Sequence, residues 1–394
     1  MKYEIREIRE GVKRKRKKKA IFDENGKQIS ELFDDVWEYG LVEGKSNYYI
    51  ASKNRKYAIF DKDGNRISEW FDWIFQNGLV EGKSNYYIVR RDLKHAIFDV
   101  DGKMISPQWF DIIWVDGLLK GESKYYIVKE NGKYAIFDVD GHMITPQWFD
   151  DISPKGLVKG LSEYYKVSKD GKYAIFDEKG NMISPEWFDY ISSSSYGLVE
   201  GKSKYYIAEK DGKEAIFDVN GNMITKEWFD RISPAGLVMG QSKYYCAKKD
   251  RKWVIFDVSG NRITEWFDGI SIDGLVKGQS KYYIAVKDGK EAIFDVNGNQ
   301  ITERFDKISP YGLVEGKSDY FIACNEDKCA VYYKDGRKVS EDFFEKYIKF
   351  NEIIINENLG IVEIKKSHET ITIDFNPVYP FKEEIIDYTK LLNI

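Results

Sequence analysis

The sequence predicts an all-β fold of tandem β-meander repeats of about 39 residues in an open or spiral solenoid-like stack, with a large β-propeller as the alternative. Two observations support this prediction. A tag of the form Ile/Val-Phe-Asp-x-x-Gly recurs at intervals of 38 to 41 residues, and aromatic residues make up 15% of the chain. The tag aspartates are Asp23, Asp61, Asp99, Asp138, Asp177, Asp218, Asp257 and Asp295. Propellers usually close with about 4–8 blades, so nine or ten units favour the open stack.

Each repeat contains a predicted hairpin. In the fourth unit, "YYIVKE" and "KYAIFDV" are rich in β-branched and aromatic residues and are separated by Asn131 and Gly132, a strong hairpin signal. "HMITPQWF" follows the turn "VDG" as a predicted third strand, and the later "GLVKG" is a candidate short fourth strand. These apolar runs are nearly continuous, so we expect neighbouring repeats to cover both faces of each sheet.

The repeats predict two regions. Residues 1–345 contain eight regular units and a degenerate ninth, "VYYKDG", with Tyr333 in the Asp position. Residues 346–394 are expected to form a degenerate terminal β-unit and a C-terminal capping helix, in which Phe381, Ile385, Tyr388 and Leu392 have helical spacing. A helix that docks onto a partner is the alternative.

The repeats resemble the WG-repeat family of bacterial proteins over roughly residues 15–345. The residues that match the family pattern in one unit are Lys133, Ile136, Phe137, Asp138, Gly141, Pro146, Phe149, Asp150, Gly156 and Leu157. The chain departs from the family at its namesake Trp-Gly pair, which is Tyr134-Ala135 here, so it looks like a divergent branch, with a convergent β-repeat as the alternative. The resemblance implies a repeat scaffold and carries over no catalytic residue.

The tag could also be read as a calcium-binding loop. The residue before the turn glycine is Asp140 in one copy but Lys179 and Ser259 in others, and the position of the expected bidentate Glu is Phe149. We therefore expect the tag to form a turn and to hold no metal.

Catalytic signals are weak. A second aspartate recurs once per unit, as in Asp150, but equivalent carboxylates share one environment, whereas acid–base catalysis needs two. We expect each to cap a backbone turn or to meet the repeated serine, such as Ser162. His95, His142 and His368 lie far apart, and no nucleotide-binding motif occurs, so we expect neither an enzyme nor a cofactor.

Charge and cysteine content favour a cytoplasmic protein. The net charge is −4, no apolar stretch is long enough to span a membrane, and the first residues lack the apolar region of a signal peptide. Cys324 and Cys329 are expected to face each other across a hairpin as free thiols, with a reversible disulfide as the alternative.

The repeats differ from one another at two places. The first is an unbroken basic run, which is either a solvated hairpin or a contact for phosphates or an acidic partner; it consists of Lys13, Arg14, Lys15, Arg16, Lys17, Lys18 and Lys19. The second follows the repeated Asp, where Trp37, Phe75 and Trp114 stand in place of the serines of later units.

We interpret this chain as a non-enzymatic scaffold that binds a protein partner through its N-terminal third. A row of aromatics along one edge would form a binding patch, although local packing of the connecting loop would also explain it. The alternatives are a glycan-binding or carbohydrate-active propeller using the Tyr and Trp faces, and an accessory protein that contacts nucleic acid through Lys13–Lys19.

Overall fold

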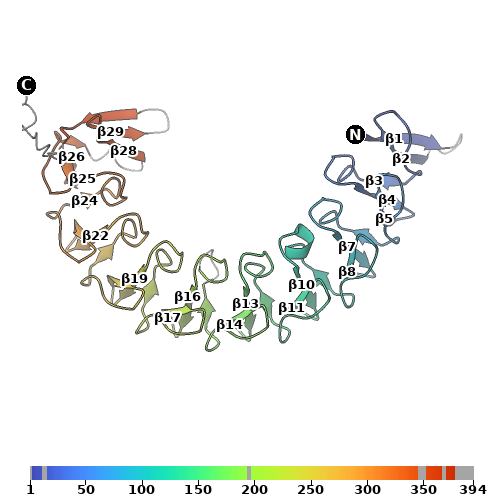
Figure 1. Ribbon diagram of the computed structural model, residues 1–394, viewed down its shortest axis with the longest axis horizontal. Coiled ribbons are helices and arrows are strands. Elements are labelled where there is room, and N and C mark those ends of the chain that lie inside the picture. The colour runs from blue at the N-terminus through green and yellow to red at the C-terminus, as the bar shows by residue number, and fades with distance from the viewer. Residues whose placement is uncertain (1, 11–15, 193–196, 345–351, 366–369, 378–394) are drawn as a thin grey trace, which may run out of the picture. The chain divides into compact units, whose positions relative to one another are not determined.

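The described residues form ten small antiparallel sheets that follow one another in sequence (Figure 1). The computed structural model describes residues 2–10, 16–192, 197–344, 352–365 and 370–377. Within these ranges the elements are strands and one short 3₁₀ helix, η1 (Gly117–Lys120). The prediction of an all-β fold of tandem meanders is confirmed.

The central strand of each regular sheet begins at the double aromatic of its repeat. These strands are β4 (Tyr48–Lys53), β7 (Tyr86–Arg91), β10 (Tyr125–Glu130), β13 (Tyr164–Lys169), β16 (Tyr205–Lys210), β19 (Tyr244–Lys249), β22 (Tyr282–Lys287) and β25 (Tyr320–Asn325). Each forms a hairpin with the strand that carries the tag. The tag strands are β5 (Lys56–Asp61), β8 (Lys94–Asp99), β11 (Lys133–Asp138), β14 (Lys172–Asp177), β17 (Lys213–Asp218), β20 (Lys252–Asp257), β23 (Lys290–Asp295) and β26 (Lys328–Tyr333).

The hairpin turn follows directly from its sequence. Asn131 and Gly132 have φ angles of 51° and 81°, and the flanking residues Glu130 and Lys133 are paired. Two consecutive positive φ angles are the requirement of a type I′ turn, whose twist matches that of the two strands. Asn and Gly tolerate this conformation better than other residues, so the predicted hairpin is confirmed.

The third strand of each meander is not the predicted one. "HMITPQWF" makes only two isolated bridges to β11, Phe137 to Met143 and Tyr134 to Phe149. In most repeats a Ser or Thr hydroxyl in this segment accepts the N–H of the central Ile of the tag strand, as Ser184 does from Ile175 at 3.1 Å. Where this bond forms, a side chain replaces part of the backbone ladder and interrupts the strand. Thr145 of "HMITPQWF" itself makes no such bond, and its hydroxyl has no hydrogen-bond partner among the described residues.

A two-residue strand on the other edge completes each sheet instead. These strands are β3 (Asp35–Val36), β6 (Trp73–Ile74), β9 (Ile112–Ile113), β12 (Asp151–Ile152), β15 (Tyr190–Ile191), β18 (Arg231–Ile232), β21 (Gly269–Ile270) and β24 (Lys307–Ile308). The predicted fourth strand is also wrong, because "GLVKG" and its equivalents form turns, or η1 between β9 and β10. A Cβ on Gly117 would lie 2.3 Å from the Tyr125 carbonyl oxygen, so this tight turn needs glycine.

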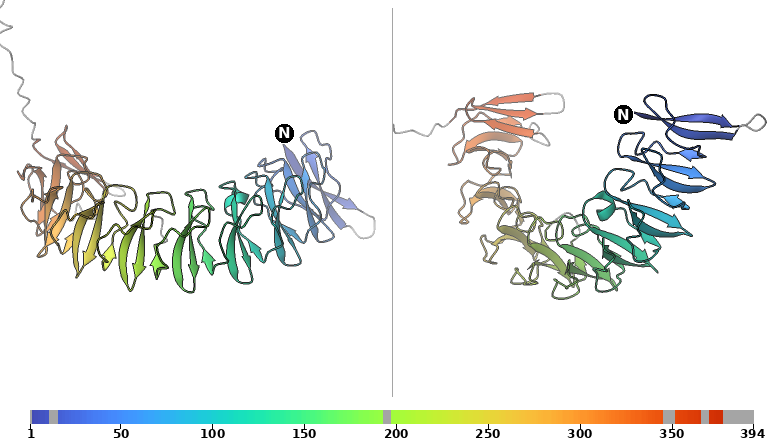
Figure 2. Two further views of the ribbon diagram at one scale, coloured as in Figure 1. Left: turned by 60° about the horizontal axis from the view of Figure 1, so that its bottom comes forward. Right: turned by 45° about the vertical axis from the view of Figure 1, so that its right-hand side comes forward.

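The chain divides into two compact units, residues 1–223 and 224–394. Within each unit, a sheet lies beside the sheets that precede and follow it in sequence, as both views of Figure 2 show. The core consists of the apolar layers between such neighbours. In one layer Ile127 and Ile136 of one sheet pack with Tyr165, Val167 and other residues of the next. Burying one such side chain contributes about 1.5–3 kcal/mol, so each repeat depends on its neighbours for stability.

The first and last elements depart from the regular repeat. A two-stranded sheet, β1 (Tyr3–Glu10) and β2 (Arg16–Asp23), precedes the regular units, and β27 (Phe343–Phe344) extends the sheet that contains β26. The tenth sheet contains β28 (Glu352–Asn356), β29 (Ile361–Lys365) and β30 (Thr370–Asp374), which agrees with a degenerate terminal β-unit. The predicted capping helix lies outside the described residues.

Candidate functional site

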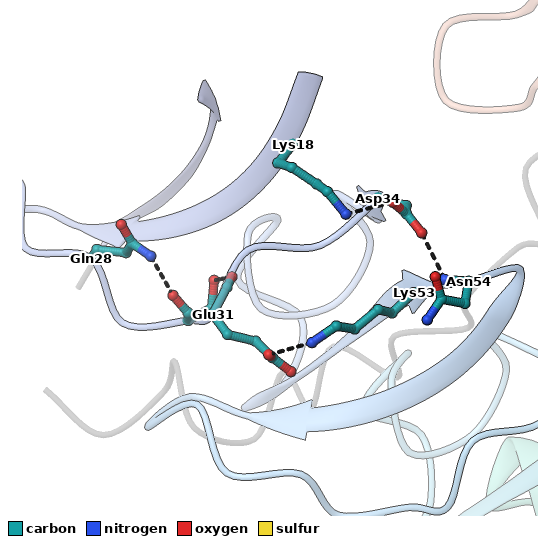
Figure 3. Close-up of polar contacts among 7 residues, drawn as sticks. Lys18, Gln28, Glu31, Asp34, Lys53 and Asn54 are labelled. Carbon is teal, nitrogen blue, oxygen red and sulfur yellow. Dashed lines mark hydrogen bonds and ion pairs between the residues drawn. The ribbon is translucent and has the colours of Figure 1, made fainter. Parts of the chain in front are cut away.

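The repeated aspartate holds the tip of a hairpin in its own sheet. Asp34 Oδ2 accepts the backbone N–H of Asn54 at 2.7 Å, and Oδ1 accepts a hydrogen bond from Lys18 Nζ, also at 2.7 Å (Figure 3). Beside it, Glu31 forms an ion pair with Lys53 at 2.8 Å. Asn54 has φ of 53°, so the carboxylate stabilises a turn residue in the left-handed region.

This arrangement recurs in the other regular repeats. The turn N–H groups that donate to the aspartates belong to Asp92, Asn131, Asp170, Asp211, Asp250, Asp288 and Glu326. The hydrogen bond from Lys133 and the N–H of Asp170 hold the pKa of Asp150 below its usual value. The expectation that these carboxylates cap turns is confirmed, and they offer the same environment in each repeat.

The tag aspartate also holds a turn. Asp138 Oδ1 accepts the N–H groups of Asp140 and His142 at 3.0 and 2.8 Å. Ligand atoms of Asp138, Asp140 and His142 lie within 4.8 Å of one another. Because Asp138 already accepts two backbone N–H groups, its position is explained by the turn, as the sequence predicts.

The basic run lies in β2 and in the residues before it. Lys13, Arg14 and Lys15 fall outside the described residues, as does the side chain of Arg16. The three described lysines all make ion pairs: Lys17 with Glu7 at 2.9 Å, Lys18 with Asp34 at 2.7 Å, and Lys19 with Asp35 at 2.6 Å. Acidic neighbours therefore neutralise part of the positive charge that the sequence places here.

Trp37, Phe75 and Trp114 occupy equivalent backbone positions. Their N–H groups donate to the carbonyl oxygens of Ile50, Ile88 and Ile127 at 2.9, 3.0 and 2.9 Å. Ser153 makes the same bond to the Lys166 carbonyl oxygen in the next repeat, at 2.9 Å. The expected alignment of the three aromatics in successive repeats is therefore present.

All three aromatic side chains are half-buried. Each packs against the ring of the residue two positions into the following tag strand: Trp37 against Tyr57 at 5.8 Å between centroids, Phe75 against His95 at 5.6 Å, and Trp114 against Tyr134 at 5.8 Å. Trp73 of β6 adds a further ring 5.2 Å from Trp37. Local packing thus fixes the rings and leaves part of each exposed.

The second ring of each tyrosine pair lies in the core. The second aromatic of each pair is buried, as in Tyr126 and Phe321, which are both 0% exposed. Tyr126 stacks on Phe137 of the tag strand with 6.1 Å between ring centroids. These second rings present no face to solvent, whereas first rings such as Tyr48 and Tyr164 are half-buried.

Lys166 is a residue that the sequence analysis missed. The residue after the tyrosine pair is apolar in the other regular repeats: Ile50, Ile88, Ile127, Ile207, Cys246, Ile284 and Ile322. Lys166 is only 8% exposed, and its Nζ donates to the Ile191 carbonyl oxygen at 3.2 Å. A comparison of this position across the regular repeats would have identified Lys166, because it is the one charged residue among apolar ones.

Cys324 and Cys329 form a disulfide, so the expectation of free thiols is wrong. The two residues are directly paired in β25 and β26, with Cα atoms 4.0 Å apart. This pairing turns both side chains to the same face of the sheet and brings their sulfurs within bonding distance. Cys246 is a buried free thiol, and burial raises its pKa to about 12, which keeps it protonated.

No helix among the described residues is long and apolar enough to cross a bilayer. No protein-family model matches the chain, and the curated proteins contain no match. Similar solved structures include "Crystal structure of the eukaryotic initiation factor", with 11% identity, 83% of this chain and 93% of that chain covered, and a TM-score of 0.32. BamB from Moraxella catarrhalis has 12% identity, coverages of 69% and 84%, and a TM-score of 0.25. At these TM-scores the similarities carry no argument about function.

Proposed function

We propose that this protein is a non-enzymatic repeat scaffold, of a divergent WG-repeat type, that binds a protein partner through its N-terminal third. The main support is the row of three aromatic side chains formed by Trp37, Phe75 and Trp114. They are half-buried and occupy equivalent positions in three successive repeats. Aromatic residues on rigid supports are favoured anchors of protein interfaces, because they bury a large area at a small cost in entropy.

The rigidity of these rings supports the proposal. Each is held by a ring contact to the following strand and by a backbone hydrogen bond to the central strand of its sheet. Little side-chain freedom would be lost on binding, so more of the contact energy would remain as affinity.

Charge completes the proposed surface. The basic run Lys13–Lys19 would bind an acidic segment of the partner. Like Trp37, this run lies in the N-terminal third of the chain. Lys17, with its side chain 62% exposed, is already paired with Glu7, so exchange of this ion pair for a partner carboxylate would affect association rate and specificity more than affinity.

The test is capture of partners by the tagged full-length chain from extracts of its native cell. The variant W37S/F75S/W114S carries the residue that later repeats place at this position, so its fold should be preserved. We expect its partner to bind at least about 100-fold more weakly, from the usual cost of removing interface anchors. The control Leu161→Ser removes an exposed apolar residue elsewhere and should leave binding unchanged. Equal binding by the triple variant would reject the proposed surface.

A further inference from the structure

A cavity lies at the sheet of β12, β13 and β14, where the sequence departs from that of the other repeats. It has a volume of about 280 Å³ and is lined by residues that include Trp114, Asp151, Ser153, Lys166, Tyr173 and Tyr190. Ser153 occupies the position that Trp37, Phe75 and Trp114 occupy in the three preceding repeats. A small side chain therefore stands where those repeats have a large aromatic ring. The space is close to the lower end of the range for small-molecule sites, about 300 Å³.

The Lys166 ammonium group lies between two aromatic rings. Its Nζ is 5.3 Å from the ring centroid of Tyr173 and 5.6 Å from that of Tyr190. The Ile191 carbonyl oxygen accepts one of its three N–H groups. Within the described part of the chain, that oxygen is its one hydrogen-bond acceptor, and no carboxylate forms an ion pair with it.

Charges near Lys166 do not compensate its burial. Asp151 on β12 attracts the ammonium from beyond ion-pair distance, while Lys155 repels it and is itself paired with Glu200 at 2.7 Å. Desolvation consequently lowers the pKa of Lys166 to about 8. A buried cation without a counter-ion is costly, and an anion that reaches it would recover part of that cost.

We propose that this cavity is a binding site for a small organic monoanion, with its carboxylate on Lys166 Nζ and its apolar body against Trp114 and Tyr190. Two N–H groups of Nζ remain to donate to the carboxylate. The carboxylate of Asp151 also lines the cavity, but this residue is exposed to solvent, whereas Lys166 is buried, so the ligand is limited to one negative charge. Aromatic walls favour a flat apolar body. This proposal concerns a small ligand and does not depend on the protein partner.

The test uses benzoate as probe and the full-length protein with ¹³C-labelled lysine. We expect benzoate to bind with a millimolar Kd, shift the Lys166 Cε resonance and raise its pKa by at least one unit, because the bound anion stabilises the ammonium form. Benzyl alcohol, which has the same ring without the charge, should bind at least tenfold more weakly.

Two variants separate the site from non-specific binding. Lys166→Ile installs the residue of the neighbouring repeats and should fold, yet bind benzoate at least tenfold more weakly. Lys179→Ile removes an exposed lysine of the same repeat and should bind as the parent does. Absence of benzoate binding to the parent protein would overturn the proposal, and so would equal binding by Lys166→Ile or by benzyl alcohol.

Discussion

The Ser280 hydroxyl donates a hydrogen bond of 2.7 Å to the Val314 carbonyl oxygen in the following repeat. The Ser280 hydroxyl oxygen also accepts the N–H of Tyr282 at 3.0 Å, so one hydroxyl joins two successive repeats. Equivalent bonds to the next repeat are made by Ser46, Ser84, Ser123, Ser162 and Ser242. The repeated serine of the "GKS" motif therefore bonds to the neighbouring repeat and not to the repeated aspartate.

Ser280→Ala should destabilise residues 224–394 by about 1–2 kcal/mol, because two partly buried backbone groups lose their partner. Chemical denaturation followed by tryptophan fluorescence measures this loss. Ser259→Ala is the matched control, since that serine lies exposed in a turn where its backbone N–H makes the hydrogen bond. The bridging role would be refuted by equal stability of the two variants.

Tyr126→Phe should leave stability unchanged or raise it slightly. The buried Tyr126 hydroxyl has no hydrogen-bond partner among the described residues, and Phe321 occupies the equivalent position in the eighth repeat. Tyr126→Ala should instead cost about 3–5 kcal/mol through the cavity it leaves. Thermal melts of the two variants provide the comparison, and a large loss in Tyr126→Phe would contradict the assignment of the ring to packing alone.

Leu93→Gly should stabilise the β7–β8 hairpin. Leu93 has φ of 65° at a turn position where the β10–β11 hairpin has Gly132, and its side chain is 80% exposed. Relief of the left-handed conformation is worth about 1–2 kcal/mol, and little packing is lost. The melting temperature of Leu93→Gly should be higher than that of the parent protein. Leu93→Ala keeps the left-handed conformation at a residue with a Cβ, so its melting temperature should stay near that of the parent.

Lys166→Ile should be more stable than the parent protein by roughly 3 kcal/mol at pH 7, from a folded pKa of about 8 against an ordinary value of 10.5. The folded state disfavours the ammonium form, so the cost is complete below pH 8. The unfolded state binds more protons between pH 8 and 10.5, and the parent therefore gains stability over that range. The denaturation midpoints of the parent and of Lys166→Ile should converge as pH rises from 8 to 10.5. A difference between the midpoints that does not change with pH would exclude the burial of a charged Lys166 as its cause.

Acid should weaken the hairpin tips. The pKa of Asp150 is lowered by Lys133 and by the Asp170 N–H, so the folded state favours the charged carboxylate. This stabilisation is present above the ordinary aspartate pKa of about 3.9 and is lost as pH falls through the lower folded value. Asp150→Asn should therefore melt below the parent at pH 7 and approach it near pH 2. A difference that persists at pH 2 would point to a role other than charge.

The sequence by itself determined the repeat length, the strand class and the hairpins. The spacing of the tag, the Tyr-Tyr pairs and turns such as Asn131-Gly132 act within a few residues, so their structure can be derived locally. It also indicated that aspartates such as Asp150 cap turns, because their carboxylates bond to nearby backbone.

Tertiary structure decided which segments pair and what lies between the repeats. "HMITPQWF" has strand propensity, yet hydroxyl-to-backbone bonds interrupt the equivalent segments, and two-residue strands such as β9 take the opposite edge. The serine bridges and the cavity beside Lys166 join residues of successive repeats, and pairing Cys324 with Cys329 depends on strand register. The serine bridges and the cavity are set by how neighbouring sheets stack and the disulfide by how two strands align, and propensities along a single strand encode neither.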